Sequence, residues 1–226
     1  MKTKSIFLVA ILLVVLTTSS RCVNIGSGIT PSKNYITRDF KVNDFDKLDI
    51  SAVADIIYTQ STDSSTSLQI YGSDNLVELI KVDVKSHTLT IKMQKKNIRK
   101  TDLKIRISSP TLQYVNIHGV GNFNVKDRLE TTNLTVKNDG VGDVKINDIT
   151  CTELNIRTEG VGNVSVKGKA EKVSLISQGV GNIKASELES DSVTAVSEGV
   201  GNISCYAKES INAEVNGVGN ISYRGN

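Results

Sequence analysis

Several residue types are scarce in this chain of 226 residues. Aromatic residues make up 4% of it, tryptophan is absent, and proline occurs twice. Proteins that bind single-stranded nucleic acid stack the bases on aromatic side chains, so this composition argues against that function. With 38% hydrophobic and 23% charged residues, the chain has the composition of a soluble folded protein and not of a polytopic membrane protein. Its length suffices for one sizeable core or two small ones.

A strong net charge is also missing. The formal charge is +3, from 27 basic and 24 acidic residues. Lys2, Lys4 and Arg21 are the only charged residues before position 22, so removal of this segment leaves 24 residues of each sign. A neutral chain lacks the long-range field that concentrates a polyanion, and we therefore predict no nucleic-acid partner.

The N-terminus has the pattern of a targeting segment. Lys2 and Lys4 precede an unbroken apolar run at 6–16, and small residues follow it. This order is typical of a secretory signal peptide. As a helix, the run covers only about 17 Å of a hydrocarbon core roughly 30 Å thick, too little for a membrane anchor. We predict an exported protein with a signal peptide at residues 1–22 and a tether at 23–37.

Cys22 stands where a bacterial lipoprotein signal places its lipid-modified cysteine, and it is our lipidation candidate. Ser19 and Ser20 supply the small residues of such a signal, but Arg21 occupies the position next to the cysteine, where Gly, Ala or Ser is expected. Plain cleavage after Ser20 is the alternative. Either route predicts a cell-envelope location, as an outer-membrane lipoprotein or as a periplasmic or surface protein, with membrane contact only through a lipid on Cys22.

One tetrapeptide, Gly-Val-Gly-Asn or Gly-Val-Gly-Asp, occurs six times in the C-terminal half at nearly constant intervals. A constant period of about 20 residues predicts a solenoid. Apolar and polar residues alternate on both sides of the tetrapeptide, which is the period of a β-strand. The units are rich in Val, Ile and Thr and contain no proline, which also favours strands. We therefore predict an all-β fold, a parallel β-helix whose coils stack about 4.8 Å apart.

We interpret each tetrapeptide as a corner of one coil. Glycine adopts backbone angles that a residue with a Cβ resists, and Asn or Asp tolerates left-handed geometry. We predict that the middle valine points inward as a plug and that the Asn and Asp side chains form a hydrogen-bonded ladder along the axis. The predicted structural corner residues are Gly119, Gly121, Asn122, Gly140, Gly142, Asp143, Gly160, Gly162, Asn163, Gly179, Gly181, Asn182, Gly199, Gly201, Asn202, Gly217, Gly219 and Asn220, and the valines are Val120, Val141, Val161, Val180, Val200 and Val218.

Residues 37–112 lack the tetrapeptide but keep the alternating pattern, as in Leu48-Asp49-Ile50. We expect earlier, irregular coils that cap the same solenoid, because an open end of a β-helix would invite edge pairing. The stretch 73–80 has room for one or two helical turns, with Asp74 and Asn75 at the expected position of the cap.

Several segments resemble a known family. They are the repeated tetrapeptide, Arg38-Asp39-Phe40, Phe45-Asp46-Lys47-Leu48, the stretch 107–112 and the closing stretch 221–225. Together they are similar to the putative auto-transporter adhesin head GIN domain family over roughly residues 38–225, and we assign a GIN-like domain to 38–226. The resemblance implies a right-handed β-helix in an exported bacterial protein, often a lipoprotein. It implies no enzymatic activity and carries over no catalytic residues.

The sequence predicts no catalytic, cofactor-binding or metal-binding residues. Pectate-lyase-like β-helices need clustered carboxylates for Ca²⁺ and a basic residue that abstracts a proton. In the column before the tetrapeptide, Asp139 and Glu159 would lie about one coil apart, so weak cation binding is an alternative to a solvated polar edge. His87 and His118 are far apart in the chain, without a zinc or nucleophile motif, and are predicted to lie on the surface.

Cys151 and Cys205 are predicted to be unpaired. Nearly three coils separate them, which corresponds to roughly 13 Å along the axis. A disulfide needs Cα atoms within about 7 Å of each other. The alternating pattern places Cys205 at an inward position.

These patterns leave three functions open. The first is a non-catalytic envelope protein that binds an unknown glycan or protein at the cell surface, as an adhesin does. The second is a structural or assembly module of the envelope, with oligomerisation through a flat β face. The third is an enzyme that processes polysaccharides.

Overall fold

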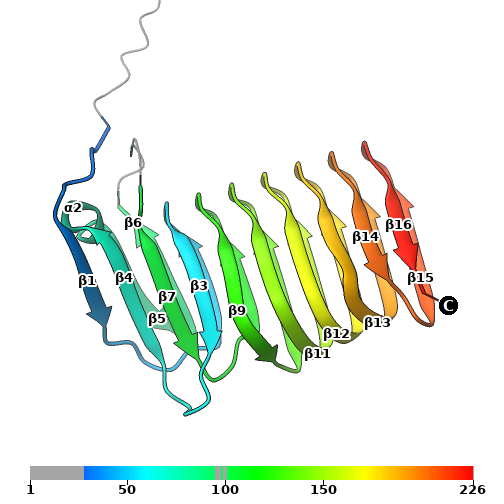
Figure 1. Ribbon diagram of the computed structural model, residues 1–226, viewed down its shortest axis with the longest axis horizontal. Coiled ribbons are helices and arrows are strands. Elements are labelled where there is room, and N and C mark those ends of the chain that lie inside the picture. The colour runs from blue at the N-terminus through cyan, green and yellow to red at the C-terminus, as the bar shows by residue number, and fades with distance from the viewer. Residues whose placement is uncertain (1–27, 95–97, 99–100, 226) are drawn as a thin grey trace, which may run out of the picture.

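The computed structural model describes residues 28–94, 98 and 101–225. The predicted signal peptide and Cys22 lie outside these residues, as does the first part of the predicted tether. The described chain forms an elongated stack of strands, with β1 at one end and β15 and β16 at the other (Figure 1). No helix in the described part is long and apolar enough to cross a membrane.

The C-terminal half is a regular parallel solenoid, as the repeat predicts. Each coil continues from a tetrapeptide into one strand segment, bends, and returns to the next tetrapeptide along another segment. Strands of successive coils pair in parallel register, so that Val144 lies beside Val164 and Val164 beside Ile183. The strands are β9 (Phe123–Glu130), β10 (Asn133–Asn138), β11 (Val144–Thr158), β12 (Val164–Ser177), β13 (Ile183–Ser197), β14 (Ile203–Tyr206), β15 (Ser210–Val215) and β16 (Ile221–Arg224).

The N-terminal half belongs to the same solenoid but is irregular, as expected. Parallel pairing continues from β8 to β2 and from β9 to β3, whereas β1, β4 and β5 pair antiparallel with their neighbours. The elements are β1 (Tyr35–Phe40), β2 (Lys47–Ser51), β3 (Asp55–Gln60), β4 (Ser67–Ser73), α2 (Asp74–Val77), β5 (Ile80–Lys85), β6 (Thr88–Met93), β7 (Lys104–Ser109) and β8 (Tyr114–Ile117).

The stacking order in this half does not follow the order of the chain. The coil formed by β2 and β3 lies between the regular coils and a coil formed by β6 and β7. The chain therefore builds one coil at 47–60, moves outward through β4, α2 and β5, and adds β6 and β7 on the outer side. It then returns past that first coil to β8. Sequence periodicity cannot show such a reversal, because it reports only neighbours along the chain.

The short helix α2 closes this end of the core. Leu76 and Val77 are fully buried, which fits a plug over the open end of a β-helix. The cap differs from our expectation, because Ser73 is the N-cap residue and Asp74 begins the helix. The Asp74 carboxylate accepts hydrogen bonds from the side chains of Ser32 and Asn34. The segment before β1, which we assigned to the tether, is thus attached to the solenoid at α2.

The core follows the alternating pattern. Counted from the first Gly of each tetrapeptide, the residues four positions before it and four and six positions after it point inward and are buried in the regular coils before the last one. From the second tetrapeptide to the fifth, the residues six positions before it are buried as well. The buried residues include Leu134, Ile156, Val164 and Cys205. In the last coil the side chains at the same positions are more exposed to solvent, and Tyr223 is 60% exposed. Cys151 and Cys205 are both buried and form no disulfide within the described residues, as predicted.

Candidate functional site

The tetrapeptides form a row of stacked corners, and their glycines are required by close approach between coils. At Gly162 the backbone φ is +147°, and a Cβ built there would lie 2.1 Å from the carbonyl oxygen of Gly142. At Gly160, where no positive φ is needed, a Cβ would lie 1.9 Å from the oxygen of Gly140. Side chains of any size are excluded from both positions, because the backbone of the preceding coil already fills the space.

Backbone hydrogen bonds join each corner to the next. The Val141 N–H donates to the Gly119 carbonyl and the Gly121 N–H donates to the Val141 carbonyl, both at 2.9 Å. The same pattern repeats along the row, and each middle valine pairs with the valine of the next coil. The corners are therefore short parallel bridges, packed as tightly as the strands.

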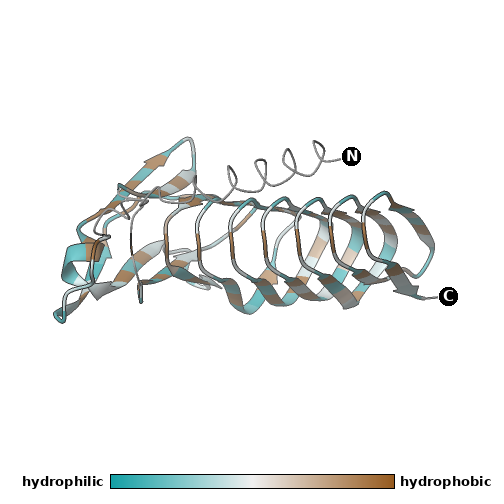
Figure 2. Ribbon diagram, turned by 90° about the horizontal axis from the view of Figure 1, so that it is seen from above, coloured by the Kyte–Doolittle hydropathy of each residue, from teal (hydrophilic) through white to brown (hydrophobic). Residues whose placement is uncertain are grey.

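The prediction that the middle valines point inward is wrong. The six valine side chains are between 48% and 69% exposed, and the turns that carry them form a row along one side of the solenoid, each with a hydrophobic segment (Figure 2). Strict alternation through the corner explains the result, because the two glycines occupy inward positions and the valine between them must point outward. We call the row Val120, Val141, Val161, Val180, Val200 and Val218 the valine ridge.

The predicted Asn ladder is present. The Asn163 side-chain oxygen accepts from the backbone N–H of Asn182 at 3.1 Å and from the Asn182 side-chain amide at 3.2 Å. Asp143 fits the ladder because only an acceptor is needed, and its carboxylate accepts from the Asn163 N–H at 2.7 Å. Each of these side chains except the last, Asn220, thus accepts a hydrogen bond from the backbone of the following coil, which is an architectural role.

A seventh corner, which we did not predict from the sequence, lies at residues 52–55. Val53 pairs with Val120, and the Asp55 carboxylate accepts from the backbone N–H of Asn122 at 3.0 Å, as the first rung of the ladder. Ala52 and Ala54 replace the glycines and are buried. The signal was present in the sequence, because Ala-Val-Ala-Asp is a small-residue version of the tetrapeptide.

On the polar edge beside the ridge, the carboxylates of Asp139 and Glu159 each contact a nitrogen-bearing side chain and are not gathered into a metal site. Asp139 lies 3.2 Å from the ring nitrogen Nδ1 of His118, and Glu159 lies 2.6 Å from Arg157. His87 and His118 are both on the surface, as predicted. Within the described residues, no group of three or more His, Cys, Asp or Glu side chains has an arrangement suited to a metal ion.

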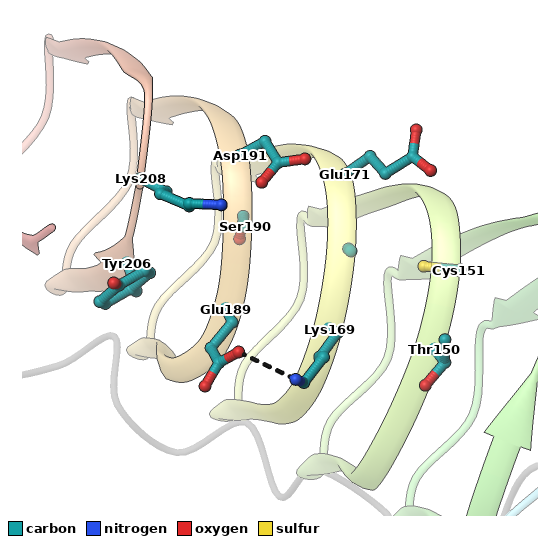
Figure 3. A pocket seen from close by; sticks show the side chains of 10 residues that line it. Thr150, Cys151, Lys169, Glu171, Glu189, Ser190, Asp191, Tyr206 and Lys208 are labelled. Carbon is teal, nitrogen blue, oxygen red and sulfur yellow. Dashed lines mark ion pairs between the residues drawn. The ribbon is translucent and has the colours of Figure 1, made fainter. Parts of the chain in front are cut away.

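A groove of about 510 Å³ lies on another side of the solenoid, where β11, β12 and β13 bend (Figure 3). Its floor consists of Cys151, Ala170 and Ser190, which stack on one another in successive coils and are all buried. These side chains are small, and the surface is therefore hollow at the bend. The groove was not predicted from the sequence, because its floor residues are spread over three coils.

Charged side chains stand on both sides of the groove floor, and an aromatic ring closes one end. Lys169 and Glu189 form an ion pair at 3.3 Å along one side, and Glu171 and Asp191 follow the other (Figure 3). Tyr206 and Lys208 line the end nearest the C-terminus. The groove thus combines carboxylate acceptors, ammonium donors, the Ser190 and Thr150 hydroxyls and a phenol ring.

Cys151 is a poor nucleophile in this setting. Burial raises the pKa of its thiol to about 11, and the carboxylates of Glu153 and Glu171 act in the same direction. The thiol is therefore protonated at neutral pH, whereas the thiolate is the reactive form. Among the described residues, no histidine lines the groove.

Comparison with known proteins places the chain in a family. Residues 44–226 match the family model described as "Putative auto-transporter adhesin, head GIN domain". The chain belongs to this family. A search of curated proteins finds no match to this GIN-domain protein.

Solved structures agree with the fold of this GIN-domain protein. A putative adhesin from Bacteroides fragilis NCTC 9343 is 43% identical, with a TM-score of 0.83 over 87% of this chain and 100% of the other. A putative adhesin from Parabacteroides merdae (20% identity, TM-score 0.73, 89% of this chain and 93% of the other) and a putative lipid binding protein from Parabacteroides distasonis (22%, 0.66, 86% and 98%) share the fold.

Proposed function

We propose that this GIN-domain protein is an exported cell-envelope protein that binds a glycan through the groove floored by Cys151, Ala170 and Ser190, without catalysis. Membership of a family named for adhesins supports a binding role at the cell envelope. The observation that carries the proposal is the composition of the groove, in which Tyr206 lies beside charged and hydroxyl groups.

A saccharide matches this composition better than an apolar ligand does. Its hydroxyl groups both donate and accept hydrogen bonds, and the groove offers the acceptors Glu171, Glu189 and Asp191 together with the donors Lys169 and Lys208. The C–H face of a sugar ring packs on an aromatic ring, for which Tyr206 is placed at one end. Acidic and basic groups nearly balance, which favours a neutral sugar over a polyanion.

A glycan array with the purified protein tests this proposal. We expect binding to a subset of neutral glycans, and Tyr206→Ala and Asp191→Ala should each weaken it about five- to thirtyfold, since a lost stacking or hydrogen-bonding group of this kind is worth roughly 1–2 kcal/mol. Tyr35→Ala is the control, because Tyr35 is a tyrosine that is 47% exposed but lies in β1 at the far end of the solenoid. An array without any bound glycan, or equal loss in the Tyr35 variant, would contradict the proposal.

An assembly role is the second candidate. It is favoured by one observation, the exposure of inward-facing side chains in the last coil.

Export and the lipid anchor at Cys22 are part of the proposal and are tested separately. A metabolic fatty-acid label should be incorporated into the protein and lost in the Cys22→Ala variant; a variant that still incorporates the label would exclude Cys22 as the anchor.

A further inference from the structure

The last coil ends the solenoid with its interior turned to solvent. Within the described chain, β15 pairs only with β13 and β16 only with β14, so one edge of each strand has no partner. The inward positions of this coil are open as well, since Val215 is 44% exposed and Tyr223 is 60% exposed. Figure 1 shows these strands as the final pair of the stack.

The edge strands at the opposite end are protected by charge. In β1 and β5, five of twelve residues are charged: Arg38, Asp39, Lys81, Asp83 and Lys85. In β15 and β16, only Glu214 and Arg224 are charged among ten residues. Charged side chains on an edge strand discourage pairing with another chain. The last coil lacks this protection, and its edges are suited to binding a strand.

We propose that the last coil binds the last coil of a second copy of this chain, which gives an end-to-end dimer with two-fold symmetry. The chain enters the corner at 217–220 along β15 and leaves it along β16. A two-fold axis that passes through Val218 and bisects the corner exchanges the two strand positions. It therefore places β15 of each copy beside β16 of the other, so that the dimer contains two equivalent antiparallel strand pairs.

The side chains of the last coil suit this arrangement. Residues at equal distance from Val218 face each other across the axis, so Val215 of one copy meets Ile221 of the other. Ala213, the smallest inward residue of β15, likewise meets Tyr223, the larger inward residue of β16.

The charges suit it too. Glu214 on β15 faces Ser222 of the partner and lies diagonal to the partner's Arg224 on β16, within reach of that long side chain. Since β15 and β16 together carry one charge of each sign, the two copies do not repel each other along these strands. The opposite end is covered by α2 and carries charged edges, so the assembly stops at two copies and does not extend into a fibre.

Sedimentation velocity of the purified protein over a concentration series tests the dimer. We expect a dimer at high concentration, and Val215→Lys should raise its dissociation constant about tenfold or more, because it places a charge in the interface. Val180→Lys is the matched control, since Val180 is 51% exposed but lies on the valine ridge, far from the last coil. Thermal unfolding of both variants establishes that they fold.

A monomer at every concentration would overturn the proposal, as would a dimer that Val180→Lys disrupts and Val215→Lys does not. Charge reversal then tests the pairing of β15 with β16. Glu214→Arg should weaken the dimer about two- to thirtyfold, because it removes two symmetry-related exposed ion pairs, and the double variant Glu214→Arg, Arg224→Glu should restore it. If the double variant is as weak as the single one, the proposed axis is wrong.

Discussion

The two ends of the solenoid differ in how far the core and the edge strands are covered. Both ends of a β-helix expose a cross-section of the core and two unpaired strand edges. At the N-terminal end, α2 buries Leu76 and Val77 over the core, and antiparallel strands with several charges form the edges. At the C-terminal end, the regular coils stop without a cap in the described chain, and inward positions such as Val215 and Tyr223 remain exposed.

Equivalent positions toward the two ends make the difference measurable. Tyr58 and Tyr223 belong to one inward column, which passes through Val125 and Cys205 and ends at Tyr223. Tyr58 is fully buried, whereas Tyr223 is mostly exposed. Asp55 and Asn220 are the first and last rungs of the Asn ladder. Equivalent positions of the repeat are therefore buried toward the N-terminal end, where further strands pack on the outer side, and exposed at the C-terminal end, where none does in the described chain.

The largest contrast should come from core truncation. Leu76→Ala should lower the free energy of unfolding by about 3 kcal/mol, because it removes a fully buried side chain that closes the core. Ile211→Ala, in the partly exposed last coil, should cost about 1 kcal/mol or less under dilute conditions that keep the protein monomeric. Urea unfolding of both variants measures the two losses. Equal losses would mean that the open end is as well packed as the closed one.

The buried tyrosine predicts a loss of stability in alkali. Burial raises the pKa of Tyr58 to about 12, while a hydrogen bond with Ser109 acts in the opposite direction. Above pH 10 the unfolded chain loses the phenol proton and the folded chain keeps it, so the stability present below pH 10 falls as pH rises toward 12. The loss should reach roughly 2–3 kcal/mol.

Urea unfolding at pH 9 and pH 11.5 checks this prediction. Tyr58→Phe should reduce the dependence of stability on pH over this range, and Tyr223→Phe is the matched control at the open end of the same column. The assignment to Tyr58 fails if its replacement leaves the alkaline loss unchanged.

The smallest contrast concerns the ends of the Asn ladder. The Asp55 carboxylate accepts two hydrogen bonds from Asn122, from its backbone N–H and its side-chain amide. Asp55→Ala should therefore cost about 1 kcal/mol, and Asp55→Asn should recover most of it, since an amide oxygen also accepts. Asn220 receives no following coil in the described chain, so Asn220→Ala should change the unfolding free energy by a few tenths of a kcal/mol. Thermal unfolding of the three variants measures these losses of stability. A larger loss for Asn220→Ala than for Asp55→Ala would show that the ladder hydrogen bonds are not the cause.

Much of the fold was predictable because the repeat encodes local rules. Alternation identified the inward columns, and the glycine spacing located the corners; both depend on residues close in the chain. The error at the valine ridge arose because alternation was not continued through the corner, where Gly160 and Gly162 occupy the inward positions beside Val161. The corner at 52–55 was missed because alanine replaces glycine there.

The groove and the stacking order of the first coils were not predictable from the pattern. The groove floor joins Cys151, Ala170 and Ser190 from three successive coils, and no single segment of sequence indicates a hollow. The outward position of β6 and β7 relative to β2 and β3 depends on a reversal of the chain. Both features result from which segments meet in space.

The local sequence determines the repeating unit, which consists of strands with an inward column of apolar residues, a glycine corner and an asparagine of the ladder. These features follow from steric limits and side-chain alternation within a single coil. Contacts between distant segments settle which end is closed, where the surface is hollow, and which edges stay open. Those features depend on burial and backbone pairing across coils, because the environment of a strand edge or a small side chain is set by what stacks beside it.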